Sequence, residues 1–150
     1  MKDPDLYKDF SVRKYRKGDF KDISHLWEVT DMGGYQRGDN ENTIEDSINM
    51  GGRLLVMEKK GNGHICGTSW MTFDGRRIHM HHFGIMPEYQ GKGLSKVLLK
   101  ESFSFVKEKG YQVKLEVHST NYKAINLYKK AGFEHLDDYN IYIIRNTSKL

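Results

Sequence analysis

The stretch that most constrains the fold covers residues 83–99, because it joins a strand to a helix through a glycine-rich loop. An apolar run predicts the strand, and Pro87, which lacks an N–H donor, ends its hydrogen-bond ladder. From Leu94 onward apolar residues return at helical spacing, which predicts an amphipathic helix. Between the two elements, Gly91 and Gly93 permit backbone conformations that side chains forbid.

This loop also predicts an anion site. A helix start leaves N–H groups without intrahelical partners, and together with the helix dipole they favour a phosphate. Gln90 and Lys92 would add side-chain donors. A P-loop would carry Ser or Thr where this chain has Gly93, and a dinucleotide fingerprint would carry Gly or Ala at Lys96. What remains is Gln-Gly-Lys-Gly-Leu-Ser over residues 90–95, with a plain glycine turn as the alternative.

Composition predicts one folded domain over residues 1–150, with a loose N-terminal arm over residues 1–10. The formal net charge of +4 suits an anionic ligand, and no block of like charge indicates a nucleic-acid arm. The single cysteine, Cys66, is expected to be a buried small hydrophobe that forms no internal disulfide. Because no apolar run is long enough to span a membrane and no signal-peptide core is present, we expect a cytoplasmic protein.

Periodicity and turn signals predict an α+β fold. The predicted strands cover residues 11–15, 53–58, 64–73, 76–86, 112–117, 133–134 and 140–145. The predicted helices cover residues 20–30, 43–50, 94–109 and about 122–131. Asp19 is placed to cap the first helix, and one of Ser119, Thr120 and Asn121 the last. The result is a mixed, mostly antiparallel sheet of about seven strands with about four helices, in which residues 53–86 form an antiparallel meander.

The loop at residues 90–95 resembles the pyrophosphate loop of the Gcn5-related N-acetyltransferase (GNAT) superfamily, Gln/Arg-x-x-Gly-x-Gly/Ala. Ser95 stands where Gly or Ala is usual, whereas the other fixed positions match. Residues 121–133 match the family's Asn-x-x-Ala-x-x-Leu-Tyr-x-x-x-Gly-Phe segment throughout, and residues 73–77 resemble the hairpin of small bacterial members. The resemblance covers nearly the whole chain and implies a three-layer domain whose sheet splays in a V between the fourth and fifth strands.

The resemblance implies an acetyl-CoA-dependent N-acetyltransferase that moves the acetyl group to a primary amine by direct attack in a ternary complex. Acetyl-CoA would be a co-substrate, held by Ile85, Gln90, Gly91, Lys92, Gly93, Leu94, Ser95 and Asn121. Tyr128 would protonate the leaving thiolate, since a phenol with a pKa of about 10 has a proton to give at neutral pH. The alternative for Tyr128 is a core tyrosine.

Two candidates for the base stay open. His79 and His81 alternate along one strand, so their side chains leave the same face, and they resemble the paired histidines of arylalkylamine N-acetyltransferase. Glu116 is spaced from Tyr128 as in the ribosomal-protein alanine acetyltransferases. The alternative for the histidines is a partly exposed sheet face without a catalytic role, and the alternative for Glu116 is a simple ion pair with a neighbour. No metal site is expected, because alternation puts only two of His79, His81 and His82 on one face.

The acceptor class is left open between a small amine and a peptide or protein N-terminus. The predicted loop over residues 31–42 offers Asp31, Tyr35, Asp39 and Glu41, which would suit a cationic amine. A non-catalytic acyl-CoA-binding module is the main alternative function, and a nucleic-acid binder, supported only by net charge, is the weaker one. No nucleic acid and no membrane are expected as partners, and a homodimer is left open.

Overall fold

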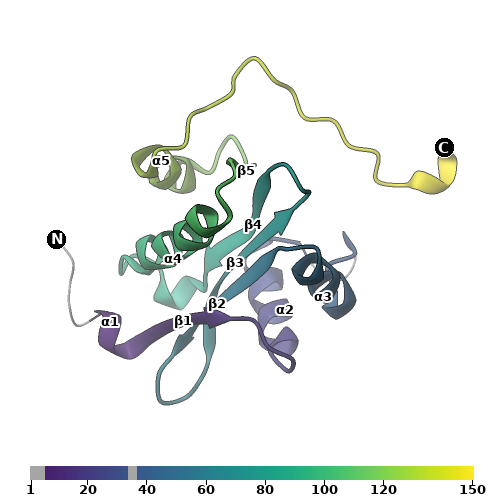
Figure 1. The fold of residues 1–150 in the computed structure, drawn as a ribbon. Helices are drawn as coiled ribbons and strands as arrows, with labels where there is room; N and C mark the ends of the chain where they lie inside the picture. Colours follow the sequence, from purple (N-terminus) through teal and green to yellow (C-terminus); the bar gives the residue numbers. More distant parts are fainter. Residues whose placement is uncertain (1–5, 34–36) are drawn as a thin grey trace. The chain divides into compact units, whose positions relative to one another are not determined.

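The computed structural model describes residues 6–33 and 37–150 (Figure 1). Contacts are concentrated within two units, which are described separately: a first unit up to Glu116 and a second unit over Val117–Leu150. Of the predicted N-terminal arm, residues 1–5 lie outside the described range, whereas Leu6–Asp9 form the one-turn helix α1. The organisation of the chain as a single domain stays a prediction.

The sheet lies in the first unit and has, among the described residues, five strands in the order β1-β2-β3-β4-β5. Their bounds are Phe10–Lys14 for β1, Arg53–Lys59 for β2, Ile65–Phe73 for β3, Ile78–Ile85 for β4 and Val113–Leu115 for β5. The first four pair antiparallel in sequence order, and β5 pairs parallel to β4. This confirms the α+β class, the meander and the mixed, mostly antiparallel sheet.

The predicted count of about seven strands is wrong for the described chain. Neither residues 133–134 nor residues 140–145 form a strand there. The apolar side chains of the second segment, Ile141, Tyr142, Ile143 and Ile144, are exposed. Alternating Ile and Tyr residues favour a strand, but a strand also needs a neighbouring edge to accept its hydrogen bonds, and propensity alone does not supply one.

Helices cover both faces of the sheet. In the first unit they are α2 (Phe20–Val29), α3 (Glu41–Asn49) and α4 (Leu94–Lys109). Adjacent residues of β3 point to opposite faces: the Thr68 hydroxyl contacts Trp27 of α2, and the Ser69 hydroxyl contacts Ser102 of α4. The sheet is therefore sandwiched between α2 and α3 on one side and α4 on the other.

The core beneath α2 and α3 is built on two stacked indoles. The rings of Trp27 and Trp70 lie 5.5 Å apart at an angle of 7°. Ile23, Leu26 and Trp27 recur at helical spacing and are fully buried, as the predicted apolar face requires. Ile44 of α3 joins the same cluster.

The predicted side-chain cap of α2 is not formed. Asp19 directly precedes the helix, but its carboxylate accepts hydrogen bonds from the Arg13 guanidinium at 2.8 and 2.9 Å and from the Arg16 N–H at 2.8 Å. Burial acts to raise the pKa of Asp19, but these bonds outweigh it and the pKa is lowered. Asp19 thus ties β1 to the start of α2.

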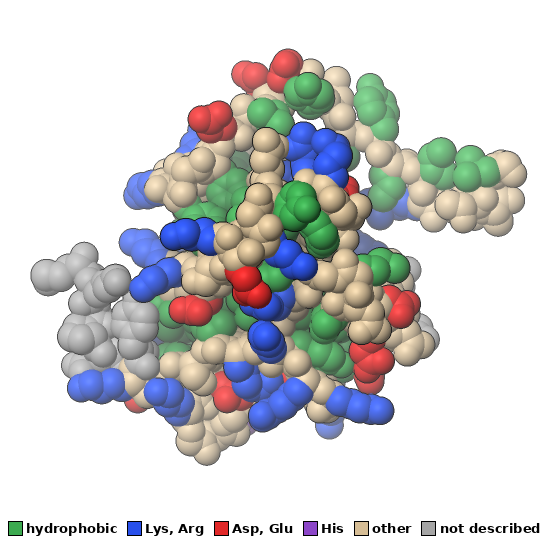
Figure 2. Space-filling view, in the orientation of Figure 1, with side chains coloured by type: hydrophobic (Ala, Val, Ile, Leu, Met, Phe, Trp, Pro, Cys, Tyr) green, Lys and Arg blue, Asp and Glu red, His purple; other side chains and the backbone are tan. Residues whose placement is uncertain are grey.

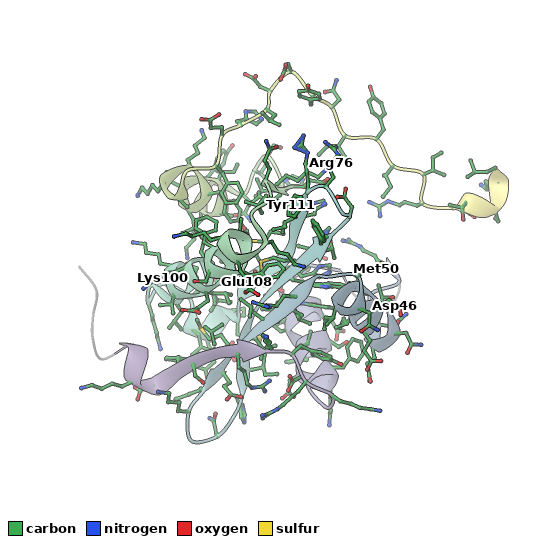
Figure 3. All side chains as sticks on the ribbon, in the orientation of Figure 1. Asp46, Met50, Arg76, Lys100, Glu108 and Tyr111 are labelled. Atoms are coloured by element: carbon green, nitrogen blue, oxygen red, sulfur yellow. The ribbon has the colours of Figure 1, made fainter. Side chains whose placement is uncertain are left out.

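The hairpin between β3 and β4 turns at Asp74-Gly75, as predicted. The Asp74 carboxylate accepts the N–H groups of Arg76 and Arg77 at 2.8 and 2.7 Å, and these bonds lower its pKa. Figure 3 labels Arg76 on this hairpin, with Tyr111 just beyond the end of α4. The helix ends at Gly110, whose φ of 75° is left-handed.

The second unit contains α5, Tyr122–Ala131, and a short 3-10 turn, η3, Thr147–Lys149. Asn121 caps α5 by accepting the Ala124 N–H at 3.2 Å, which settles the three predicted alternatives. Gly132, with φ of 105°, ends the helix.

Candidate active site

The loop between β4 and α4 has the geometry of an open helix start. After the 3-10 turn η2 (Pro87–Tyr89), Gly91 and Gly93 adopt left-handed φ values of 77° and 82°. Within the described structure no side chain caps α4, and its first turn carries no acidic residue. The N–H groups of that turn and the positive end of the helix dipole could therefore bind an anion without competition from a carboxylate of the helix.

Gln90 braces this loop against the end of β4. Its side-chain amide donates to the carbonyl oxygen of Ile85 at 2.8 Å, so one of its N–H donors is already engaged. The Lys92 ammonium lies 5.6 Å from the ring centroid of Tyr89, and the Lys59 ammonium lies 6.0 Å from it. Positive charge from two segments thus gathers beside the loop.

The strand that leads into the loop separates from its neighbour. The parallel ladder between β4 and β5 runs from Ile78↔Val113 to Met80↔Leu115, and β4 continues to Ile85 paired with β3. The backbone of β4 beyond Met80 is therefore not covered by the β5 ladder.

The two open candidates for the base lie together where that ladder ends. The rings of His79 and His81 are 3.8 Å apart, which confirms that they share a face. His79 Nε2 lies 3.9 Å from a carboxylate oxygen of Glu116, at the end of β5. The Thr72 hydroxyl contacts His81 Nε2 at 2.8 Å.

Burial holds both imidazoles in the neutral form at neutral pH. It lowers the pKa of His81 to about 3, and the neighbouring His79 and His82 act in the same direction. Burial also lowers the pKa of His79, against an opposing effect of Glu116. A site of this kind presents uncharged nitrogen atoms, with a carboxylate in reach only of His79.

Sequence reasoning missed a second histidine–carboxylate pair. His82 Nε2 lies 3.1 Å from Asp39 Oδ2, and its ring packs 4.3 Å from the Trp27 ring and 5.2 Å from the Trp70 ring. Strict alternation would place His82 on the face opposite His81, but a register shift in β4 brings both toward Trp70. Across the described residues, no group of three or more His, Cys, Asp or Glu side chains is arranged to hold a metal ion.

The predicted acceptor residues have different surroundings. Asp39 faces His82 and is largely buried, and Glu41 is the first residue of α3. Asp31 adopts a left-handed φ of 54° after α2, and Tyr35 lies outside the described residues. Cys66 is fully buried with its pKa raised by burial to about 11, in agreement with an inert thiol.

The second unit holds the remaining predicted site residues. Tyr128 is buried on α5, its ring lies 5.6 Å from that of Phe133, and burial raises its pKa to about 12. The hydroxyl therefore keeps its proton at neutral pH. The side-chain carbonyl oxygen of Asn121 caps α5, which leaves the N–H groups of the same side-chain amide as donors.

Solved structures share this fold. An acetyltransferase from Streptococcus agalactiae matches with a TM-score of 0.76 at 16% identity, over 91% of this chain and 92% of its own. Naa50 from Arabidopsis thaliana, in complex with the bisubstrate analogue CoA-Ac-MVNAL, matches with a TM-score of 0.71 at 22% identity, over 90% and 91%. Glucosamine-6-phosphate N-acetyltransferase from Arabidopsis thaliana matches with a TM-score of 0.68 at 20% identity, over 92% and 98%.

A family model covers most of the chain. The model of the acetyltransferase (GNAT) family matches residues 20–133, from the start of α2 to just beyond α5. No helix in the described part of the chain is long and apolar enough to cross a membrane. The matched span contains the glycine loop, the paired histidines and α5, and on this evidence the chain belongs to the GNAT acetyltransferase family.

Proposed function

We propose that this chain transfers the acetyl group of acetyl-CoA to a primary amine by direct attack in a ternary complex. The observation that carries the proposal is the uncapped start of α4, which follows a strand whose backbone extends beyond its parallel neighbour. A long, thin substrate with a diphosphate at one end fits an exposed strand edge that leads into an anion-binding loop. The bisubstrate analogue bound to the Arabidopsis neighbour contains coenzyme A, which supports this choice of co-substrate.

The loop would hold the diphosphate of acetyl-CoA. Main-chain N–H groups over residues 91–95 would bind it, with Lys92 adding positive charge. Ile85 would offer β4 backbone to the pantetheine arm, where the two strands splay apart, and the Asn121 amide would be a further donor. Gln90 would act mainly as the brace that sets the distance between strand and loop.

We assign acceptance of the amine proton to His79 together with Glu116. A base must be neutral before it accepts a proton and must bind that proton firmly enough to remove it. His81, with a pKa lowered to about 3, meets the first condition and not the second. For His79 the Glu116 carboxylate at 3.9 Å opposes the effect of burial and would stabilise the imidazolium. His81, in contact with Thr72, would keep the His79 ring in place.

Tyr128 would return a proton to the sulfur of the departing coenzyme A. A phenol with a pKa raised to about 12 is fully protonated in the resting enzyme. The thiolate that forms as the C–S bond breaks is the group that needs this proton. Cys66 is buried with a raised pKa, which supports direct transfer over an acetylated cysteine.

The acceptor is proposed at the level of a primary amine. Among the structural neighbours, one is named for a sugar phosphate amine, and another was solved with an analogue that ends in a peptide. Asp39 is engaged by His82, so Asp31 and Glu41 are the better candidates to attract a cationic amine. We keep the reducing cytoplasm as the proposed location, because Cys66 has no described cysteine partner.

A non-catalytic acyl-CoA-binding module would use the same loop, whereas a nucleic-acid binder would need a basic surface. Figure 2 shows Lys and Arg side chains spread over the visible face with acidic side chains among them, so this face is not a continuous basic surface of the kind that binds nucleic acid. A homodimer stays a prediction.

The deciding experiment measures thiol release from acetyl-CoA against a panel of small amines, amino sugars and peptides, with calorimetry of coenzyme A binding. Tyr128→Phe should lower kcat by about 10²-fold or more, as expected on removal of a general acid, and leave coenzyme A affinity unchanged. Tyr122→Phe, at an exposed tyrosine of the same helix, is the matched control and should behave as wild type. Coenzyme A binding without thiol release from any acceptor would identify a binding module instead.

A further inference from the structure

A one-residue bulge interrupts β4 between the histidines and the loop. Thr68 pairs with Gly84 and Trp70 with His81, so Ser69 alone opposes both His82 and Phe83. At this point His82 adopts a left-handed φ of 44°. That conformation is strained for a residue with a side chain, so the surrounding structure must hold it in place.

The carbonyl of His82 is held from β3. The Thr68 hydroxyl donates to it at 2.7 Å and in turn accepts the indole N–H of Trp27 at 2.9 Å. Thr68 and Trp27 are fully buried, so this chain of hydrogen bonds runs without competition from water.

The ring of His82 is held from the other side. Asp39 binds Nε2, and Trp27 packs against the ring face. The second nitrogen, Nδ1, is buried, and the described structure gives it no hydrogen-bond partner. His82 therefore presents no accessible nitrogen to a substrate, and its effect must pass through the backbone that it fixes.

The bulge decides which way the end of β4 faces. A side chain on Gly84 would meet Met32, on the face of α2, at 2.8 Å. Ile85 points to the opposite face. There, a Cβ atom added to Gly67 would lie 2.7 Å from Cδ1 of Ile85. Because side chains alternate, loss of the extra residue would exchange the faces of Gly84 and Ile85.

We propose that His82 is a positioning residue, locked by Thr68 and Asp39, that sets the orientation of the β4 backbone along which acetyl-CoA binds. The inference rests on the proposed function, since it concerns the strand that would hold the pantetheine arm. It makes the buried polar network of Trp27, Thr68, His82 and Asp39 a determinant of co-substrate affinity, at a distance from the reacting atoms.

The test uses Thr68→Val, which keeps the shape of the side chain and removes the hydroxyl. Loss of one buried hydrogen bond to the strained carbonyl should weaken coenzyme A binding in calorimetry, and raise the KM for acetyl-CoA, about tenfold, which corresponds to about 1.4 kcal/mol. The KM for the acceptor should stay within about twofold. Thr68→Ser, which restores the hydroxyl, should recover most of the affinity. His82→Asn, which tolerates a left-handed φ but loses the ring, should act in the same direction as Thr68→Val.

Ser69→Ala is the matched control. It removes a neighbouring buried hydroxyl of the same strand, one that binds Ser102 on the α4 face. It should lower stability by a similar amount and leave coenzyme A affinity unchanged. Equal affinities for Thr68→Val and Ser69→Ala would overturn the inference, as would a His82→Asn variant that loses kcat and one limb of its pH profile at unchanged acetyl-CoA KM. A wild-type protein that binds no coenzyme A would refute the proposed function itself.

Discussion

The two faces of β3 and β4 are built from the same strands and have opposite characters. Toward α4 the strands present Met71, Ile78 and Met80, which are almost completely buried, and one hydroxyl pair. Toward α2 and α3 they present Thr68, Thr72, Trp70 and all three histidines of β4. Outside the bulge, alternate residues thus contribute to a dry support, and the residues between them contribute titratable groups and hydrogen bonds.

The difference teaches how one sheet supplies both stability and reactivity. On the α4 face, apolar packing stabilises the fold, and a charged group buried there would be costly. On the other face each polar group has a neighbour that fixes it: Thr72 contacts His81, Glu116 lies near His79, and Asp39 binds His82. If this division is correct, changes on the α4 face should mainly alter the free energy of unfolding, and changes on the other face should alter turnover or co-substrate affinity.

The largest expected effect is on the supporting face. Met71→Ala removes a fully buried side chain and should lower the free energy of unfolding by about 3 kcal/mol through lost burial and a residual cavity. Urea denaturation measures this change, and kinetics per folded molecule should be unaffected. Met50→Ala is the matched control, because Met50 is 70% exposed directly after the last residue of α3, where Figure 3 labels it. A large fall in kcat for fully folded Met71→Ala would contradict the proposed division between the two faces.

On the reactive face, His79→Gln should lower kcat/KM by about 10²-fold, the range expected when a general base is lost. The free energy of unfolding should change little, because His79 remains partly exposed. Steady-state kinetics at saturating acetyl-CoA provide the measurement, with exposed His64→Gln as the control. Activity within threefold of wild type would remove His79 from the proposed mechanism and leave Glu116 as the base.

A smaller effect should appear in the pH dependence of stability. The pKa of His81 is about 3 in the folded protein and about 6.5 when unfolded, so between these values the unfolded chain binds more protons. Stability from this group is therefore complete above pH 6.5 and falls as the pH drops, by about 1 kcal/mol between pH 7 and pH 5.5. Burial lowers the pKa of His79 and His82 in the same sense.

Urea denaturation of wild type and His81→Gln at the two pH values isolates this contribution. The variant should show a shallower decrease in stability toward acid than wild type. Identical slopes would mean that the imidazole of His81 is hydrated in the folded protein, contrary to its place in the division between the two faces.

Much of the first unit follows from local sequence patterns. Alternation predicts that His79 and His81 share a face, Asp74-Gly75 predicts the hairpin, and the glycine loop predicts the start of α4. The bulge at His82 does not follow, because it is held by Asp39, 43 residues away in sequence, and by Trp27 of another element. The last two predicted strands fail for a related reason, since β-propensity does not specify which edge a segment will pair with.

The hydrogen bond between Gln90 and Ile85 joins the end of β4 to the glycine loop, the two places where we propose that the pantetheine arm and the diphosphate bind. The carbonyl oxygen of Ile85 has a second lone pair. A ligand bound along β4 would therefore either share this acceptor with the Gln90 amide or displace the Gln90 amide from it. In both cases, binding of a ligand along β4 would change the position of the Gln90 side chain in the loop. Fragments that lack a diphosphate, yet pair with the strand, should therefore alter how tightly inorganic pyrophosphate is retained.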